Sequence, residues 1–170
     1  GGVDKTGELS SDELARVIGN GLNVTDKISA MTDCNVYIIT VPTPVDIDNI
    51  PDLTPLRDAS RSVASVLRPG DTVIYESTVY PGATEEECVP LLEEGSGLRY
   101  NLDFHVGYSP ERVNPGDREH RVENISKITS GSSAEAADFV DRLYASVLKA
   151  PTFRAASIKT AEAAKILENT

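Results

Sequence analysis

Three short apolar blocks, each followed by a loop that contains proline, constrain the fold of this chain more than any other feature. They cover residues 35–41 (NVYIITV), 71–78 (DTVIYEST) and 103–108 (DFHVGY). Each block is rich in β-branched and aromatic residues, as is typical of strands buried on both faces. We predict a strand at each block, a fourth strand at residues 126–129 and a short last strand at residues 152–154.

Helical segments alternate with these strands. The predicted helices cover residues 10–19, 54–67, 84–95 and 133–148, and a terminal helix begins near residue 157. Thr84 and Glu87 have the spacing of a capping box at the start of the third helix. Strands that alternate with helices indicate βαβ units, so we predict an α/β fold with a parallel sheet. Right-handed crossovers then place the loops that follow the strands at one edge, where such sheets bind ligands.

The loops after the first three blocks carry polar side chains at matching places. Thr43 lies in VPTP, Thr78 in ESTVYPG and Glu111 in YSPERVNPG. If the strands are parallel, these three side chains meet at one edge, and the prolines stiffen the loops that hold them. A hydroxyl and a carboxylate that converge can hold and deprotonate a water or an alcohol. The spacing alone also allows a structural role, in which the hydroxyls cap helices and Glu111 is solvated.

The terminal helix presents a second candidate cluster. Glu162, Lys165 and Asn169 share one helical face. A lysine ammonium and an asparagine amide one turn apart can stabilise a negative oxygen. The spacing by itself favours a plainer interpretation, an ordinary Glu–Lys pair on a solvent-exposed helix.

Charge and cysteine content narrow the class of protein. The chain has 27 acidic and 16 basic residues and a net charge of −11, which argues against a nucleic acid or an anionic membrane as partner. Cys34 and Cys88 have no metal-ligand or C-x-x-C spacing. We therefore expect two inert core thiols, no metal site and a cytoplasmic protein.

Five motifs resemble one enzyme family when they are taken in order. VPTP, ESTVYPG, YSPERVNPGD, KITSGS and AEAAKILEN are similar to segments of the UDP-glucose/GDP-mannose dehydrogenase family. The likeness is greatest to its bacterial UDP-N-acetylhexosamine (GlcNAc or GalNAc) 6-dehydrogenases of capsule and O-antigen lipopolysaccharide synthesis, the Vi-polysaccharide type. The resemblance implies a partial Rossmann-like, doubly wound parallel sheet. Residues 1–156 then form the later part of an N-terminal NAD-binding domain, and residues 157–170 begin a central connecting helix.

The resemblance also implies an activity, the NAD-dependent double oxidation of a UDP-sugar C6 alcohol to a carboxylate through a cysteine-bound intermediate. By motif match, Thr78 and Glu111 serve water and proton transfers, while Lys165 and Asn169 stabilise the negative oxygen and contact the substrate. Residues implied to line the NAD site are Pro42, Thr43, Ser77 and Thr78. Those implied to lie against the UDP-sugar are Arg112, Val113 and Asn114.

The chain departs from the family pattern in three places. Pro115 stands where the UDP-glucose branch has a second acid. The family's glycine-rich loop and acidic ribose-binding residue are expected before Gly1, and its catalytic cysteine after Thr170. We therefore expect a fragment that is inactive alone, has an unpaired sheet edge, and comes from a homodimeric enzyme. The alternatives are a UDP-N-acetylmannosamine or UDP-glucose 6-dehydrogenase, or a non-catalytic α/β binding module if the protein ends at residue 170.

Overall fold

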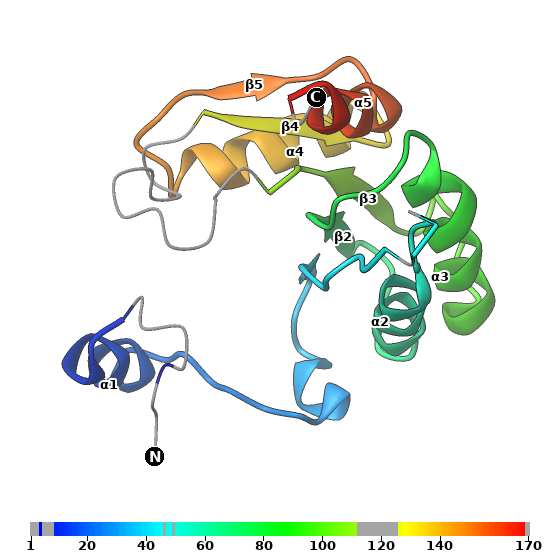
Figure 1. Ribbon diagram of the computed structural model, residues 1–170. Coiled ribbons are helices and arrows are strands. Elements are labelled where there is room, and N and C mark those ends of the chain that lie inside the picture. Colours follow the sequence, from blue (N-terminus) through cyan, green and yellow to red (C-terminus); the bar gives the residue numbers. More distant parts are fainter. Residues whose placement is uncertain (1–3, 5–8, 46, 49, 112–125, 169–170) are drawn as a thin grey trace.

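A five-stranded sheet forms the centre of the molecule (Figure 1). The computed structural model describes residues 4, 9–45, 47–48, 50–111 and 126–168. The strands lie in the order β1-β2-β3-β4-β5. Their bounds are β1 Val36–Ile39, β2 Thr72–Tyr75, β3 His105–Tyr108, β4 Lys127–Gly131 and β5 Thr152–Arg154. The predicted α/β class and all five predicted strands are confirmed.

The first three strands are parallel, with Ile38, Ile74 and Gly107 side by side. β4 runs antiparallel to β3, and β5 is parallel to β4. The expectation of a wholly parallel sheet is therefore wrong for its last two strands. A parallel neighbour needs a crossover, usually a helix that packs on the sheet. The sequence between β3 and β4 predicts no such helix, and β4 returns in the opposite direction.

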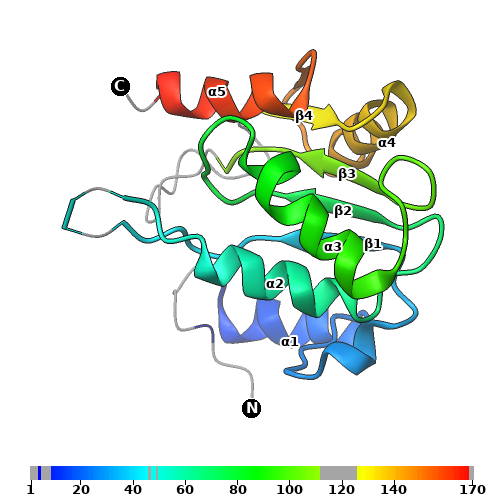
Figure 2. The same cartoon turned by 90° about the vertical axis from the view of Figure 1, so that its right-hand side faces the viewer.

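Helices cover both faces of the sheet, as a doubly wound fold requires (Figure 2). On one face lie α2 (Thr54–Ala64), the π-helical turn η2 (Thr84–Cys88), α3 (Val89–Ser96) and the start of α5 (Ile158–Glu168). On the other face lies α4 (Ala134–Ala145). The longest helix described has 12 residues, and none in this part of the chain is long and apolar enough to cross a membrane.

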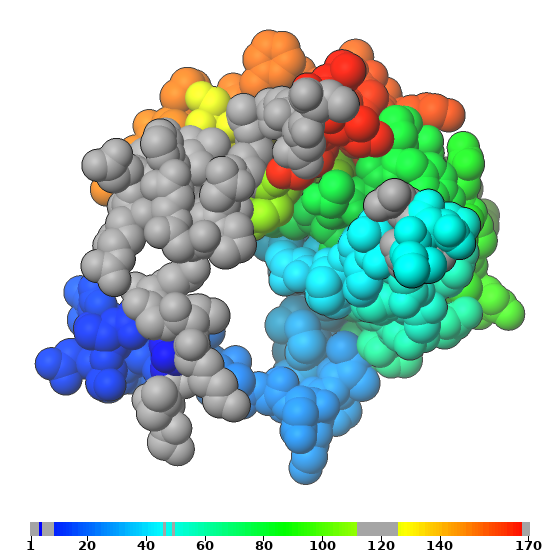
Figure 3. All heavy atoms as spheres, viewed as in Figure 1, coloured from blue at the N-terminus to red at the C-terminus, as the bar shows by residue number. Residues whose placement is uncertain are grey.

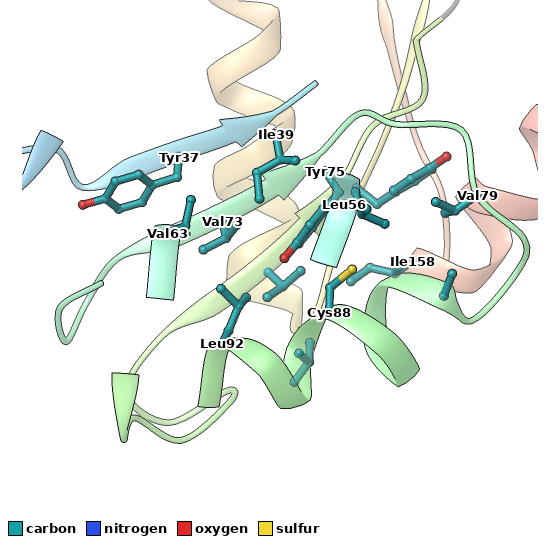
Figure 4. Close-up of a cluster of buried hydrophobic side chains, with 14 of the residues drawn as sticks. Tyr37, Ile39, Leu56, Val63, Val73, Tyr75, Val79, Cys88, Leu92 and Ile158 are labelled. Atoms are coloured by element: carbon teal, nitrogen blue, oxygen red, sulfur yellow. The ribbon is translucent and has the colours of Figure 1, made fainter. Parts of the chain in front are cut away.

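The core follows from the period of two along β2. Every residue of this strand is buried, and successive side chains point to opposite faces. Val73 and Tyr75 join the larger cluster under α2 and α3, where Cys88 and Leu92 also point (Figure 4). Ile74 packs on the other face against Val140 and Tyr144 of α4.

The N-terminal segment is peripheral. The helix predicted over residues 10–19 is confirmed as α1 (Ser11–Gly19), and it begins with a capping box in which the side chains of Ser10 and Glu13 each accept from the other's backbone N–H. None of the residues of α1 is buried, and the helix lies apart from those that cover the sheet (Figures 1 and 3). A 3-10 turn, η1 (Ile28–Met31), precedes β1.

Two local predictions are wrong. Thr84 and Glu87 form no capping box: the Thr84 hydroxyl oxygen is buried without a hydrogen-bond partner among the described residues. The Glu87 carboxylate instead accepts from Arg57 at 2.6 Å. The Thr84 N–H at this helix start donates instead to the carboxylate of Glu162, which is distant in sequence. Cys34 is exposed rather than in the core, whereas Cys88 is buried as predicted.

Candidate functional site

The carboxyl ends of the three parallel strands enclose a cavity of about 250 Å³. The residues that line it follow β1, β2 and β3: Thr40, Val41, Pro42, Thr43, Glu76, Ser77, Thr78 and Glu111. The predicted convergence of Thr43, Thr78 and Glu111 at one edge is therefore confirmed. Thr78 and Glu111 are exposed and accessible to a ligand. Their chemical roles stay predictions.

Hydrogen bonds hold the three loops together. The buried Ser77 hydroxyl donates to the Val41 carbonyl at 2.6 Å, which ties the second loop to the first. Tyr108 at the end of β3 donates its hydroxyl to the Ser77 carbonyl at 3.2 Å. The Glu111 N–H donates to the Glu76 carbonyl at 3.2 Å. These hydrogen bonds connect the three loops that form the cavity wall.

Thr43 is the residue whose surroundings point to a polar ligand. Its hydroxyl oxygen is buried and has no hydrogen-bond partner among the described residues. Buried hydroxyls nearly always have a hydrogen-bond partner, and a ligand bound in the cavity can supply one to Thr43. A nicotinamide cofactor offers amide and ribose hydroxyl groups, and open α/β sheets bind such cofactors at this edge. The residues present therefore fit NAD at the cavity.

A buried charged cluster lies behind the cavity. Lys127 Nζ is 3.1 Å from Glu76 Oε2, and the two side chains are 8% and 12% exposed. The Tyr144 hydroxyl donates to the other oxygen of Glu76. Burial and the negative charge of Glu76 raise the pKa of Tyr144 above its ordinary range, so the hydroxyl keeps its proton. Sequence reasoning missed this cluster, because it depends on the direction of β4.

α5 is anchored to the second loop by a buried carboxylate. Glu162 is 0% exposed and accepts from the backbone N–H groups of Gly82 at 2.5 Å and Thr84 at 2.9 Å. The expectation of an ordinary solvent-exposed Glu–Lys pair is thus wrong for Glu162. The Glu162 carboxylate is stabilised by backbone N–H groups at the start of η2 rather than by the Lys165 ammonium, since a carboxylate interacts favourably with a helix N-terminus.

The remaining predicted residues lie outside the cavity wall or outside the described residues. Lys165 is partly buried on α5 and is not among the residues that line the cavity. Asn169 and the predicted substrate contacts Arg112, Val113 and Asn114 lie outside the described residues, as does Pro115.

The described residues also include a second cavity. A larger cavity, of about 480 Å³, lies between the starts of α4 and α5 and contains none of the predicted site residues. In the described ranges, no group of three or more His, Cys, Asp or Glu side chains is placed to hold a metal ion.

Comparison with known proteins decides the family. Residues 8–148 match the UDP-glucose/GDP-mannose dehydrogenase family, NAD binding domain. The chain belongs to this family. It is 57% identical over 169 residues to UDP-N-acetyl-D-glucosamine 6-dehydrogenase of Pseudomonas aeruginosa, a match that covers 99% of this chain and 40% of that protein. To the enzyme of the same name from Salmonella typhi it is 55% identical, over 99% of this chain and 39% of that protein.

A solved relative has the same fold. The structure of UDP-D-ManNAc dehydrogenase from Pyrococcus horikoshii superposes with a TM-score of 0.85 at 42% identity, covering 93% of this chain and 37% of that one. The chain thus spans about 40% of the length of the curated relatives named above. The predicted family, fold and NAD-binding character are confirmed.

Proposed function

We propose that this chain is part of an NAD-dependent UDP-N-acetyl-D-glucosamine 6-dehydrogenase. Such an enzyme oxidises the C6 alcohol of UDP-N-acetylglucosamine, or of the galactosamine epimer, to the uronic acid for surface polysaccharide synthesis. The observation that carries the proposal is the 57% identity over 99% of the chain to an enzyme of this name. Identity to a UDP-N-acetyl-D-mannosamine dehydrogenase from Pyrococcus horikoshii is lower, 43% over 92% of the chain.

The cavity at the strand ends is the proposed reaction site. Pro42, Thr43 and Ser77 lie beside the cofactor, and NAD supplies a hydride acceptor when it is bound. Thr78 and Glu111 face the same space from two loops, where a hydroxyl and a carboxylate hold water and accept a proton from the alcohol. The orphaned Thr43 hydroxyl and the exposure of Thr78 and Glu111 support this assignment.

The remaining roles extend the proposal. Lys165 and Asn169 stabilise the negative oxygen at C6, and the stretch of Arg112, Val113 and Asn114 contacts the UDP-sugar. Residues 1–156 form the later part of the NAD-binding domain, and residues 157–170 begin a central helix through which the full-length enzyme forms a homodimer. We place this enzyme in the cytoplasm.

The test is a substrate panel with the full-length protein that contains this chain. NADH formation is followed at 340 nm with UDP-N-acetylglucosamine, UDP-N-acetylgalactosamine, UDP-N-acetylmannosamine and UDP-glucose. We expect the highest kcat/KM with one of the first two sugars and two NADH per sugar oxidised. A preference for UDP-N-acetylmannosamine or UDP-glucose would reassign the substrate. Absence of NADH with every sugar, from a folded protein, would favour a non-catalytic module.

A further inference from the structure

Lys127 is buried at the first position of β4. Only 7% of the residue is exposed. Its ammonium lies 3.1 Å from Glu76 Oε2, 3.3 Å from the Pro110 carbonyl oxygen and 5.0 Å from the centre of the Tyr144 ring. Lysine is almost never fully buried unless it is paired. Hydrogen bonds from a charged donor in such surroundings are about twice as strong as neutral ones.

Among the described residues, Lys127 has two hydrogen-bond acceptors, and they belong to two different loops of the candidate site. Glu76 begins the loop that carries Thr78 and is one of the residues that line the cavity. Pro110 immediately precedes Glu111, whose N–H donates to the Glu76 carbonyl at 3.2 Å. One ammonium therefore joins the loop of the hydroxyl to the loop of the carboxylate.

The direction of β4 brings Lys127 to this place. Tyr108 of β3 pairs with Ser130 of β4 in antiparallel register. Past this pair, the Ser109 hydroxyl donates to the Ile128 carbonyl at 2.7 Å, and Lys127 Nζ donates to the Pro110 carbonyl at 3.3 Å. A parallel fourth strand would begin at the other edge of the sheet, far from the cavity. The antiparallel direction of β4 therefore brings the Lys127 ammonium next to the loops of the candidate site.

We propose that Lys127 is a positioning residue that fixes the Glu111 carboxylate relative to Thr78 by holding Glu76 and the Pro110 carbonyl. The inference rests on the proposed function. If Lys127 only stabilised the fold, a variant that removes both charges of the Lys127–Glu76 pair would keep the activity. A positioning lysine is not replaceable in that way, because the Pro110 carbonyl and the Glu76 side chain lose their common donor.

The experiment compares three variants of the full-length enzyme. Lys127→Met leaves Glu76 buried without its cation. The double variant Lys127→Met/Glu76→Gln removes both charges, and a buried pair replaced as a whole is often tolerated by the fold. Lys159→Met is the matched control, because Lys159 is 60% exposed and faces Glu86 at 3.7 Å on the surface. Each is measured for melting temperature, kcat, KM for NAD, and hydrogen exchange in a peptide that contains Ser109 and Glu111.

We expect the double variant to melt within a few degrees of wild type but to lose about 100-fold in kcat, the scale of a 1 Å misplacement. KM for NAD changes less than threefold, and the Ser109–Glu111 amides exchange at least tenfold faster. Lys159→Met behaves as wild type. A folded double variant with wild-type kcat and wild-type exchange overturns the inference. If wild type oxidises no UDP-sugar, the proposed function fails, and the exchange rates still decide the role of Lys127.

Discussion

At the scale of the residue, Cys34 and Cys88 lie in opposite surroundings. Cys34 is exposed, whereas Cys88 is 0% exposed in the cluster under α2 and α3 (Figure 4). Burial raises the pKa of the Cys88 thiol to about 11. Because the thiolate is the reactive form, Cys88 is both inaccessible and protonated at neutral pH. Neither thiol lies in the candidate site.

We expect one thiol per chain to react with a disulfide reagent at pH 8 in the native state, and two in denaturant. The native Cys34→Ser variant should show almost no reaction at pH 8. Reaction of Cys88 should rise only as the pH approaches about 11 or as the fold opens. Equal labelling rates for both thiols at pH 8 in the folded chain would contradict the burial of Cys88.

Glu162 is a second residue whose burial defines its role. Its carboxylate accepts two backbone N–H groups, from Gly82 and Thr84. Glu162→Ala leaves both donors without a partner, and each orphaned buried donor costs about 1–3 kcal/mol. We therefore expect a loss of about 2–6 kcal/mol in the free energy of unfolding, measured in urea.

Glu162→Gln is the matched control, because its carbonyl oxygen still accepts one of the two hydrogen bonds. It should lose about half as much stability as Glu162→Ala, because one of the two donors stays without a partner. If both variants unfold like wild type, the contact between α5 and η2 contributes little to the fold.

At the scale of the element, α4 packs on the end of β4 with no room for a side chain. A Cβ on Gly131 would lie 2.2 Å from the backbone N of Ala137 and 2.5 Å from the carbonyl carbon of Ala136. Backbone atoms cannot turn aside as a flexible side chain does. We expect Gly131→Ala to shift α4 and to cost about 3 kcal/mol, the upper part of the range for overpacking, in urea unfolding.

Gly19 provides the control for this helix contact. It ends α1, and a Cβ there would meet nothing within 4 Å. Gly19→Ala should therefore be neutral or slightly stabilising, because alanine favours the helix over glycine. Equal stability of Gly131→Ala and Gly19→Ala would mean that α4 is free to move away from β4.

The elements themselves were predictable, and their exceptions have physical causes. The blocks that form β1, β2 and β3 are short apolar runs, each followed by a loop that contains proline, so local composition sufficed. The direction of β4 was wrong because the prediction extended the parallel βαβ pattern to this strand, although the sequence between β3 and β4 predicts no crossover helix. The capping box predicted at the start of η2 was wrong because of a long-range contact. Thr84 and Glu87 match the capping pattern, but Glu162, distant in sequence, supplies the acceptor.

The same division holds for the site. Thr43, Thr78 and Glu111 were predictable as neighbours, because parallel strands end at one edge. Lys127 was not, since a parallel β4 would have placed it elsewhere. Glu162 was expected at the surface because its spacing to Lys165 matches an ordinary helical Glu–Lys pair. Its burial depends on how α5 docks onto the second loop.

At the scale of the whole molecule, the sheet has an open edge. β1 pairs with β2 and with no other strand among the described residues. Its Ile38 is 47% exposed, although Tyr37 and Ile39 on the other face are buried. An edge strand with unpaired backbone groups and apolar side chains is a template for pairing with another chain.

We expect the isolated 170-residue chain to self-associate through β1. Sedimentation should show oligomers that grow with concentration, and Ile38→Lys should shift them toward monomer, because an edge lysine opposes pairing. Ile166→Lys, at a residue that is 42% exposed on α5, controls for added charge. A chain that stays monomeric at every concentration, or association lost equally in both variants, would argue against this edge as the contact.

The hydrogen bonds from the second loop to Glu162 also predict which positions of related sequences can be substituted. Both donors are main-chain groups, which every residue except proline possesses. A substitution at position 84 therefore keeps its N–H donor, whereas position 82 is restricted to glycine, because Gly82 has a φ of +102° and a Cβ there would lie 2.6 Å from Glu86 Oε1. Position 162 has no such freedom, because a longer, shorter or uncharged side chain fails to reach both donors. We therefore expect Glu162 and Gly82 to leave a signature in related sequences, and the Thr84 donor to leave none.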